Sequence, residues 1–163
     1  MDSLLKRHPF EPGQVQKVVV QIAPCLACVN DRLMPDICMQ HLVAVMLIDK
    51  TVSFRSVHDK PCMQDPAILR ERVKVEVKVD NELASHQAIV EVTLADGTHP
   101  TERVDAVRGT AQNPMSRDEV AAKARDVITP VFGMAACAKP VEKLLAFETV
   151  KNTRELRPLL QRA

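Results

Sequence analysis

Two stretches in the middle of the chain alternate between apolar and polar residues, over 73–80 and 88–94. A period of two predicts β-strands that have one face in water. An Asp-Gly dipeptide follows the second stretch, and glycine accepts the positive φ that a tight hairpin needs, so 101–107 is predicted to return as a third strand. These strands predict an antiparallel meander, which the β-branched segment 17–22 can join as a fourth strand.

The segment 37–48 is apolar on nearly every side past His41 and is long enough for about three turns of helix. Because no polar face is left for solvent, we expect a buried helix with Asp36 as its N-cap. Residues 25–35, which precede it, show no strong periodicity and predict a loop. An Asp-Pro dipeptide farther along is typical of a helix start and predicts a short helix over 67–71.

The last third of the chain is predicted to be helical. The sequence Ser-Arg-Asp-Glu, which starts at residue 116, is a capping box, in which the hydroxyl and the carboxylate satisfy each other's backbone N–H groups. This helix is expected to end at 130–133, and a second one spans about 135–150. Asn152 caps a last short helix.

Together these elements predict an α+β fold, in which a small antiparallel sheet of three to four strands is covered by helices on one face. A chain of 163 residues fits one domain with a full hydrophobic core. We therefore expect a single domain over 1–163, with 1–11 as a lead-in to it.

Composition narrows the possible functions. Lys plus Arg total 22 and Asp plus Glu total 21, so a basic groove for nucleic acid is not expected. Neither Trp nor Tyr occurs, so the aromatic side chains on which bases stack are also missing. We therefore expect no nucleic-acid partner. The longest apolar run, 42–48, is too short to span a bilayer, and the first residues do not resemble a signal segment. Because no apolar run is long enough to cross a bilayer and the charges are balanced, no membrane partner is expected. Five cysteines are an odd number, which favours reduced thiols in the cytoplasm.

The cysteines allow a zinc site as one interpretation. Cys25 and Cys28 form a C-x-x-C, and Cys38 and His41 form a C-x-x-H with the same gap. Three thiolates and one imidazole suit tetrahedral zinc. Apolar neighbours on both halves favour the alternative that these are core residues, so no metal is expected. A thioredoxin-like redox pair is disfavoured because no long helix opens at the first motif.

The sequence also predicts a second candidate site, which suits an anionic ligand. Gln40 and His41 lie in the first turns of the predicted buried helix, and the uncapped N–H groups of such a turn attract carboxylates. Arg32, in the preceding loop, can hold a carboxylate through two hydrogen bonds. We therefore predict substrate contacts at Gln40, His41 and Arg32. The alternatives are a His41 that bonds to a neighbouring carbonyl oxygen and an Arg32 in a surface ion pair.

No catalytic residue is predicted from the residues themselves. With only four glycines, the chain contains no phosphate-binding loop, no nucleophile elbow and no dinucleotide fingerprint, so no cofactor is expected. His58, Asp59 and His99 are expected to be solvated loop residues. No nucleophile stands near an obvious base in the sequence.

Four sequence motifs follow one another along the chain: 34–49 (MPDICMQHLVAVMLID), 92–97 (VTLADG), 103–109 (RVDAVRG) and 113–116 (NPMS). Together they resemble the C-terminal part of the MmgE/PrpD family, which includes 2-methylcitrate dehydratases and cis-aconitate decarboxylases. The similarity runs from about residue 12 to the end of the chain.

The resemblance implies a two-domain lyase of cytoplasmic propionate metabolism. A helical domain precedes a smaller α/β domain, and a di- or tricarboxylate binds in the cleft between them. This chain resembles only the smaller, lid-like domain, and the main acid and base residues of the family belong to the helical domain. We therefore expect a domain that is inactive alone and meets a small carboxylate only when a helical domain is supplied. Many relatives have an aromatic residue where His41 stands.

Two other functions stay open at this stage. One is a non-catalytic module that binds a ligand or a protein, and the other is the zinc-stabilised domain described above. A lid without its partner domain exposes apolar surface, so we also expect self-association, as a symmetric dimer.

Overall fold

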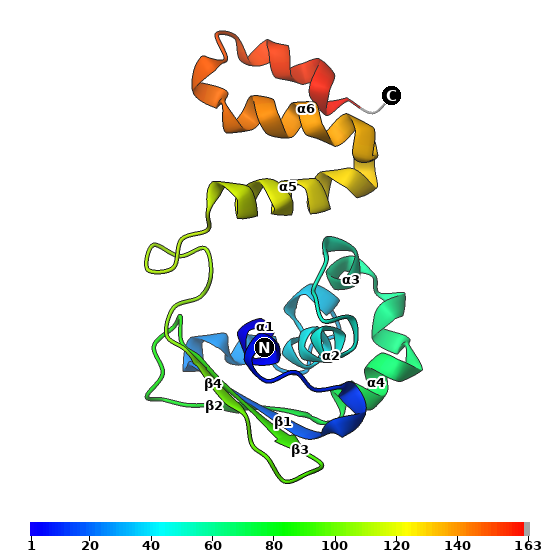
Figure 1. Cartoon of the computed structure of the whole chain (residues 1–163), viewed down its shortest axis with the longest axis vertical. Helices are drawn as coiled ribbons and strands as arrows, with labels where there is room; N and C mark the ends of the chain where they lie inside the picture. Colours follow the sequence, from blue (N-terminus) through cyan, green and yellow to red (C-terminus); the bar gives the residue numbers. More distant parts are fainter. Residues whose placement is uncertain (162–163) are drawn as a thin grey trace. The chain divides into compact units, whose positions relative to one another are not determined.

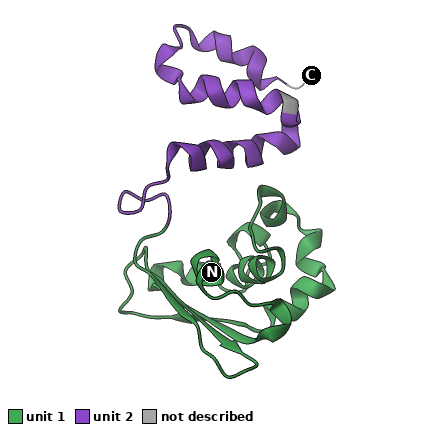
Figure 2. Ribbon diagram, in the orientation of Figure 1, with its two compact units in different colours: residues 1–107 green, residues 108–163 purple. Residues whose placement is uncertain are grey.

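The chain forms two compact units, which cover residues 1–107 and 108–163 (Figure 2). The computed structural model describes residues 1–161, with the side chain of Ala135 left aside. Helices and one four-stranded sheet make up an α+β fold, as the sequence predicts. None of the helices within 1–161 has the length and apolar character that a bilayer crossing demands.

The first unit contains the sheet and the helices that cover one of its faces (Figure 1). Its strands are β1 (Val15–Ile22), β2 (Val75–Val79), β3 (Ala88–Leu94) and β4 (Thr101–Val104). Its α-helices are α1 (Asp2–Arg7), α2 (Met39–Asp49), α3 (Phe54–His58) and α4 (Pro66–Arg72). Short 3-10 helices connect them: η1 (Pro12–Gln14), η2 (Pro24–Val29), η3 (Pro35–Ile37) and η4 (Pro61–Gln64).

The sheet has the strand order β2-β1-β3-β4 and is mixed, so the prediction of a purely antiparallel meander is wrong. β1 lies between β2 and β3. It pairs in parallel with β2 and antiparallel with β3. The physical reason is burial: β1 carries the densest apolar run, Val18 to Val20, and a central strand is covered better than an edge strand. The helices between β1 and β2 supply the crossover that parallel pairing requires.

The core of the first unit lies between the sheet and its helices. Leu47 of α2 is completely buried there, and α1 contributes the equally buried Leu4, so residues 1–11 take part in the core. Alternate residues of the strands point the same way and complete the cluster. The buried members are Leu4, Phe10, Val15, Val18, Val20, Ile22, Val43, Leu47, Val75, Val90 and Val92.

Helix α2 is buried, as predicted, but it starts later than predicted. Asp36 is not its N-cap, because Pro35–Ile37 form the separate 3-10 turn η3. Cys38 precedes the helix with an extended backbone and makes no side-chain cap hydrogen bond. Helix α4 begins as predicted, since the Asp65 carboxylate accepts a hydrogen bond from the Ala67 backbone N–H at 2.7 Å.

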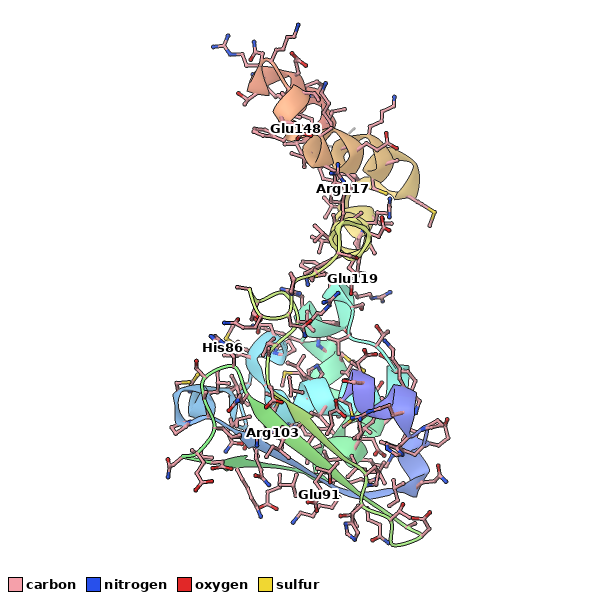
Figure 3. The ribbon with its side chains drawn as sticks, turned by 60° about the vertical axis from the view of Figure 1, so that its left-hand side comes forward. His86, Glu91, Arg103, Arg117, Glu119 and Glu148 are labelled. Atoms are coloured by element: carbon pink, nitrogen blue, oxygen red, sulfur yellow. The ribbon has the colours of Figure 1, made fainter. Side chains whose placement is uncertain are left out.

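The second unit contains α5 (Arg117–Phe132), α6 (Met134–Leu145), η5 (Phe147–Thr149) and η6 (Thr153–Leu160). The predicted capping box starts α5: Ser116 accepts from the Glu119 N–H, and the Glu119 carboxylate accepts from the Ser116 N–H at 2.8 Å. These hydrogen bonds and the ion pair with Arg108 lower the pKa of Glu119 to about 2. Figure 3 marks Glu119 in the first turn of this helix.

We predict that Leu47→Ala destabilises the first unit by about 2–5 kcal/mol, because it leaves a cavity in a closely packed core. Leu33→Ala is the matched control, since Leu33 is 86% exposed and its loss is expected to change stability by no more than about 0.5 kcal/mol. Urea unfolding followed by circular dichroism measures both. Equal effects of the two substitutions would contradict the placement of α2 in the core.

Candidate functional site

Gln40 forms hydrogen bonds that hold the loop preceding α2. The side chain of Gln40 is buried, its Oε1 accepts a hydrogen bond from the Asp31 backbone N–H at 2.9 Å, and its Nε2 donates to Oδ1 of Asn30. Asp31 has a φ of 48°, in the left-handed region that few residues other than glycine adopt. The hydrogen bond from Gln40 therefore holds a loop conformation that the backbone would not favour by itself.

Arg72, at the end of α4, meets the same loop from the other side. Its Nη2 donates to Oδ1 of Asp31 at 2.6 Å, and its side chain is only 16% exposed, whereas that of Asp31 is largely in solvent. Asn30, Asp31, Gln40 and Arg72 border one open hollow of about 550 Å³. Residues of α4 and β2 form its other walls: Leu69, Val73, Val75, Glu76 and Val77.

The hollow carries one cation and two carboxylates among its lining residues. The hydrogen bond from Lys17 is the main reason that the pKa of Glu76 is lowered, and Lys78 adds to it. Glu76 therefore stays ionised at neutral pH. Because Arg72 is already paired with Asp31, the Asp31 carboxylate competes with any anionic ligand that reaches Arg72.

His41 lies inside the protein rather than at the rim of the hollow. Its side chain is completely buried, and its Nε2 lies 3.4 Å from the Ser56 carbonyl oxygen. This is the alternative arrangement, in which the histidine bonds to a neighbouring carbonyl. Within residues 1–161, Nδ1 of His41 has no hydrogen-bond partner. Burial is the main reason that the pKa of His41 is lowered; the hydrogen bond with Ser56 opposes it in part, and the nearby charge of Arg72 adds a smaller lowering.

Arg32 is exposed, and its Nε donates to the carbonyl oxygen of Cys28. The structure thus brings Gln40 together with Asn30, Asp31 and Arg72, while His41 and Arg32 lie elsewhere. Sequence reasoning missed Arg72, which stands one residue beyond the predicted short helix. The only sequence signal for it was its place in the last turn of a capped helix.

The candidate zinc ligands and the loop histidines do not form a common site. Cys25 and Cys28 are exposed, whereas Cys38 and His41 are buried. In the described part of the chain, no three His, Cys, Asp or Glu side chains come close enough to hold a metal. His58 lies at the end of α3, where its ring stacks on Phe54 at 4.1 Å between centroids, and His99 lies at the surface beside Thr93.

A comparison with known families finds one match. A family model described as the MmgE/PrpD C-terminal domain matches residues 1–146 of the 163. The match begins at the first residue, so it includes the lead-in that carries α1, and it ends at the end of α6. No curated protein matches the chain significantly.

The burial of His41 predicts a pH dependence of stability. A histidine whose pKa falls on folding is neutral in the folded state, so unfolding takes up a proton once the pH falls below the ordinary value of 6.5. The contribution of His41 to stability is therefore expected to be constant above about pH 7 and to decrease as the pH falls towards about 5. Urea unfolding midpoints measured across this range test it.

Two variants isolate the contribution of His41 to this slope. His41→Gln cannot titrate and is expected to flatten the decrease below about pH 6.5. His86→Gln removes an exposed histidine, which Figure 3 marks on the first unit, and is expected to keep the wild-type slope. A His41→Gln protein with an unchanged slope would show that His41 is not buried in its neutral form.

Proposed function

The chain belongs to the MmgE/PrpD family, and from this premise we propose that it forms the lid side of a lyase cleft that binds a di- or tricarboxylate. The proposed substrate class is that of the 2-methylcitrate dehydratases, which are members of this family. The observation that carries the proposal is an exposed apolar loop beside a surface arginine. Both features lie in the segment that connects η2 to α2.

The apolar loop consists of Leu33, Met34 and Ile37, which are 86%, 49% and 41% exposed. η3, which contains Ile37, packs against α3, and Phe54 at the start of α3 is also exposed. Apolar side chains that gather at a surface favour contact with another polypeptide. We propose that a helical domain of the same enzyme covers this loop and closes the cleft over it.

Arg32 directly precedes the apolar loop and lies in solvent. A guanidinium group at the edge of a buried contact can bind one carboxylate of the substrate through two parallel hydrogen bonds. Gln40 positions Arg32 indirectly, because Gln40 forms hydrogen bonds with Asn30 and Asp31, the two residues that precede Arg32 in the chain. His41 is buried beside Gln40 in α2, and its Nε2 lies near the Ser56 carbonyl oxygen of α3. In this proposal Arg32 contacts the substrate, and Gln40 and His41 are positioning residues.

Loss of water or of carbon dioxide from such a substrate needs a base and an acid aimed at adjacent atoms. In this proposal the helical domain supplies both groups. The lid holds the substrate and keeps water away from it. The domain is therefore expected to be inactive by itself.

We predict that the chain turns over 2-methylcitrate only when a helical domain of the family is added, with the unsaturated product followed by ultraviolet absorbance. Within that mixture Arg32→Gln should lower kcat/KM by about 10- to 100-fold, because a charge-assisted pair with the substrate is worth about 1.5–3 kcal/mol. Arg32→Lys keeps the charge but not the planar fork and should recover part of the loss. Arg70→Gln, on the exposed side of α4, is the matched control and should have no effect.

Turnover by the isolated chain would contradict this account, as would equal losses from Arg32→Gln and Arg70→Gln. A stable complex with the helical domain that showed no turnover would favour the interaction module instead. The same measurement therefore separates the two functions.

Self-association is the second expected behaviour of the exposed loop. We propose that without the helical domain two copies pair through Leu33, Met34 and Ile37 as a symmetric dimer. Met34→Asp should shift the chain towards monomer in sedimentation velocity, because it places a charge in the contact. Met134→Asp, at an exposed methionine of the second unit, should leave the distribution unchanged. A wild-type chain that stayed monomeric at high concentration would contradict this expectation.

A further inference from the structure

The 3-10 helix η2 shows a burial pattern that repeats every third residue. Leu26 and Val29 pack against the core cluster of the first unit, whereas Cys25 and Cys28 are exposed. A 3-10 helix has three residues per turn, so side chains at i and i+3 lie one above the other. These two partly buried residues therefore anchor one face of η2, and the two cysteines share another face that is exposed to solvent.

The geometry of η2 places the two cysteines at a Cα separation that a disulfide can span. With a rise of about 2 Å per residue and a whole turn between them, the Cα atoms of Cys25 and Cys28 are separated by about 6 Å. Disulfides in proteins span Cα separations of about 4.4–6.8 Å. The same stacking places the two Cβ atoms about 6 Å apart, beyond the about 3.5–4.5 Å that a disulfide spans, so the bond needs this one turn to unwind locally as well as rotation of the side chains.

We propose that Cys25 and Cys28 are a redox-active dithiol that closes reversibly to a disulfide in the folded protein. The oxidant is a small disulfide, such as oxidised glutathione. One protein thiolate attacks its S–S bond, forms a mixed disulfide and releases one glutathione thiolate; the second protein thiolate then attacks the mixed disulfide and releases the other. The protons of the two cysteine thiols pass to the two glutathione thiolates, so the protein is oxidised and the oxidant is reduced to two thiols.

The other cysteines do not compete for this role. Cys38 and Cys137 are buried, and Cys62 is partly covered in the turn η4. The Cys25–Cys28 bond would close a ring over a single turn, so it constrains the unfolded chain little and adds little stability. Exposure together with a short ring is typical of disulfides that form and break in response to conditions rather than of structural ones.

The dithiol lies next to the segment described above. The Cys28 carbonyl oxygen accepts the hydrogen bond from Arg32, and Asn30, which ends η2, binds Gln40. The inference does not rest on the proposed carboxylate site, because it follows from η2 alone. Its test accordingly needs neither substrate nor helical domain.

The experiment incubates the folded chain in glutathione buffers of graded oxidised-to-reduced ratio, quenches it with an alkylating agent and measures mass. Tryptic peptide 18–32 contains both cysteines and no other. As the ratio rises, we expect this peptide to change from a doubly alkylated form to an unalkylated form two hydrogens lighter than the free dithiol, to return to the alkylated form after reduction, and to carry no stable glutathione. Thermal unfolding of the oxidised chain should differ little from that of the reduced one.

Serine variants give the decisive comparison. Cys25→Ser and Cys28→Ser lack the resolving thiol, so each should retain one glutathione on the remaining cysteine of this peptide. Cys62→Ser should oxidise like the wild type. Stable glutathione adducts on the wild-type peptide, a bond from either residue to Cys62, or a peptide that stays reduced at every ratio unless the chain is denatured would each overturn the proposal.

Discussion

The position of β1 in the middle of the sheet is the constraint on which the first unit depends. Val18, Val20 and Ile22 are buried there, and full burial of each such side chain contributes about 1.5–3 kcal/mol. Their burial requires strands on both sides of β1 and α2 across one face. The covalent chain can meet that requirement only through a long crossover, which contains the loop at 30–37 and the helices α2 to α4. Every residue of the candidate site is carried by that crossover or by the strand that follows it.

Local patterns in the sequence identify most of the long elements but not which elements lie side by side. Alternation predicts β2 and β3, and the capping box at Ser116 predicts the start of α5, because both depend on residues close in the chain. The helix α1 and the 3-10 helix η2 were not predicted, because 1–11 was expected to be a lead-in and 25–35 a loop. Strand order depends instead on which apolar run is buried best against distant elements, and no local period encodes it. The start of α2 was misplaced for a similar reason: Asp36 is a good capping residue, but the 3-10 turn around it competes with the helix.

The candidate site shows the same division between local residues, which the sequence reveals, and distant partners, which it does not. Gln40 stands out as a polar residue in an apolar helix, and its hydrogen bonds to the preceding loop account for its presence. Arg72 and Asp31 are separated by 41 positions, so their ion pair follows from the packing of α4 beside the loop and not from spacing. The environment of His41 likewise depends on a distant element, because Ser56 of α3, whose carbonyl oxygen lies 3.4 Å from Nε2, is 15 positions away in the chain.

These features describe a domain whose fold is complete but whose connecting segment keeps apolar side chains at the surface. Hydrogen–deuterium exchange of the chain, with and without an added helical domain of the family, tests that description most directly. The account predicts that slowed exchange on mixing is concentrated in residues 31–37 and at the start of α3. Unchanged exchange in that segment, or protection confined to the outer face of the sheet, would contradict it.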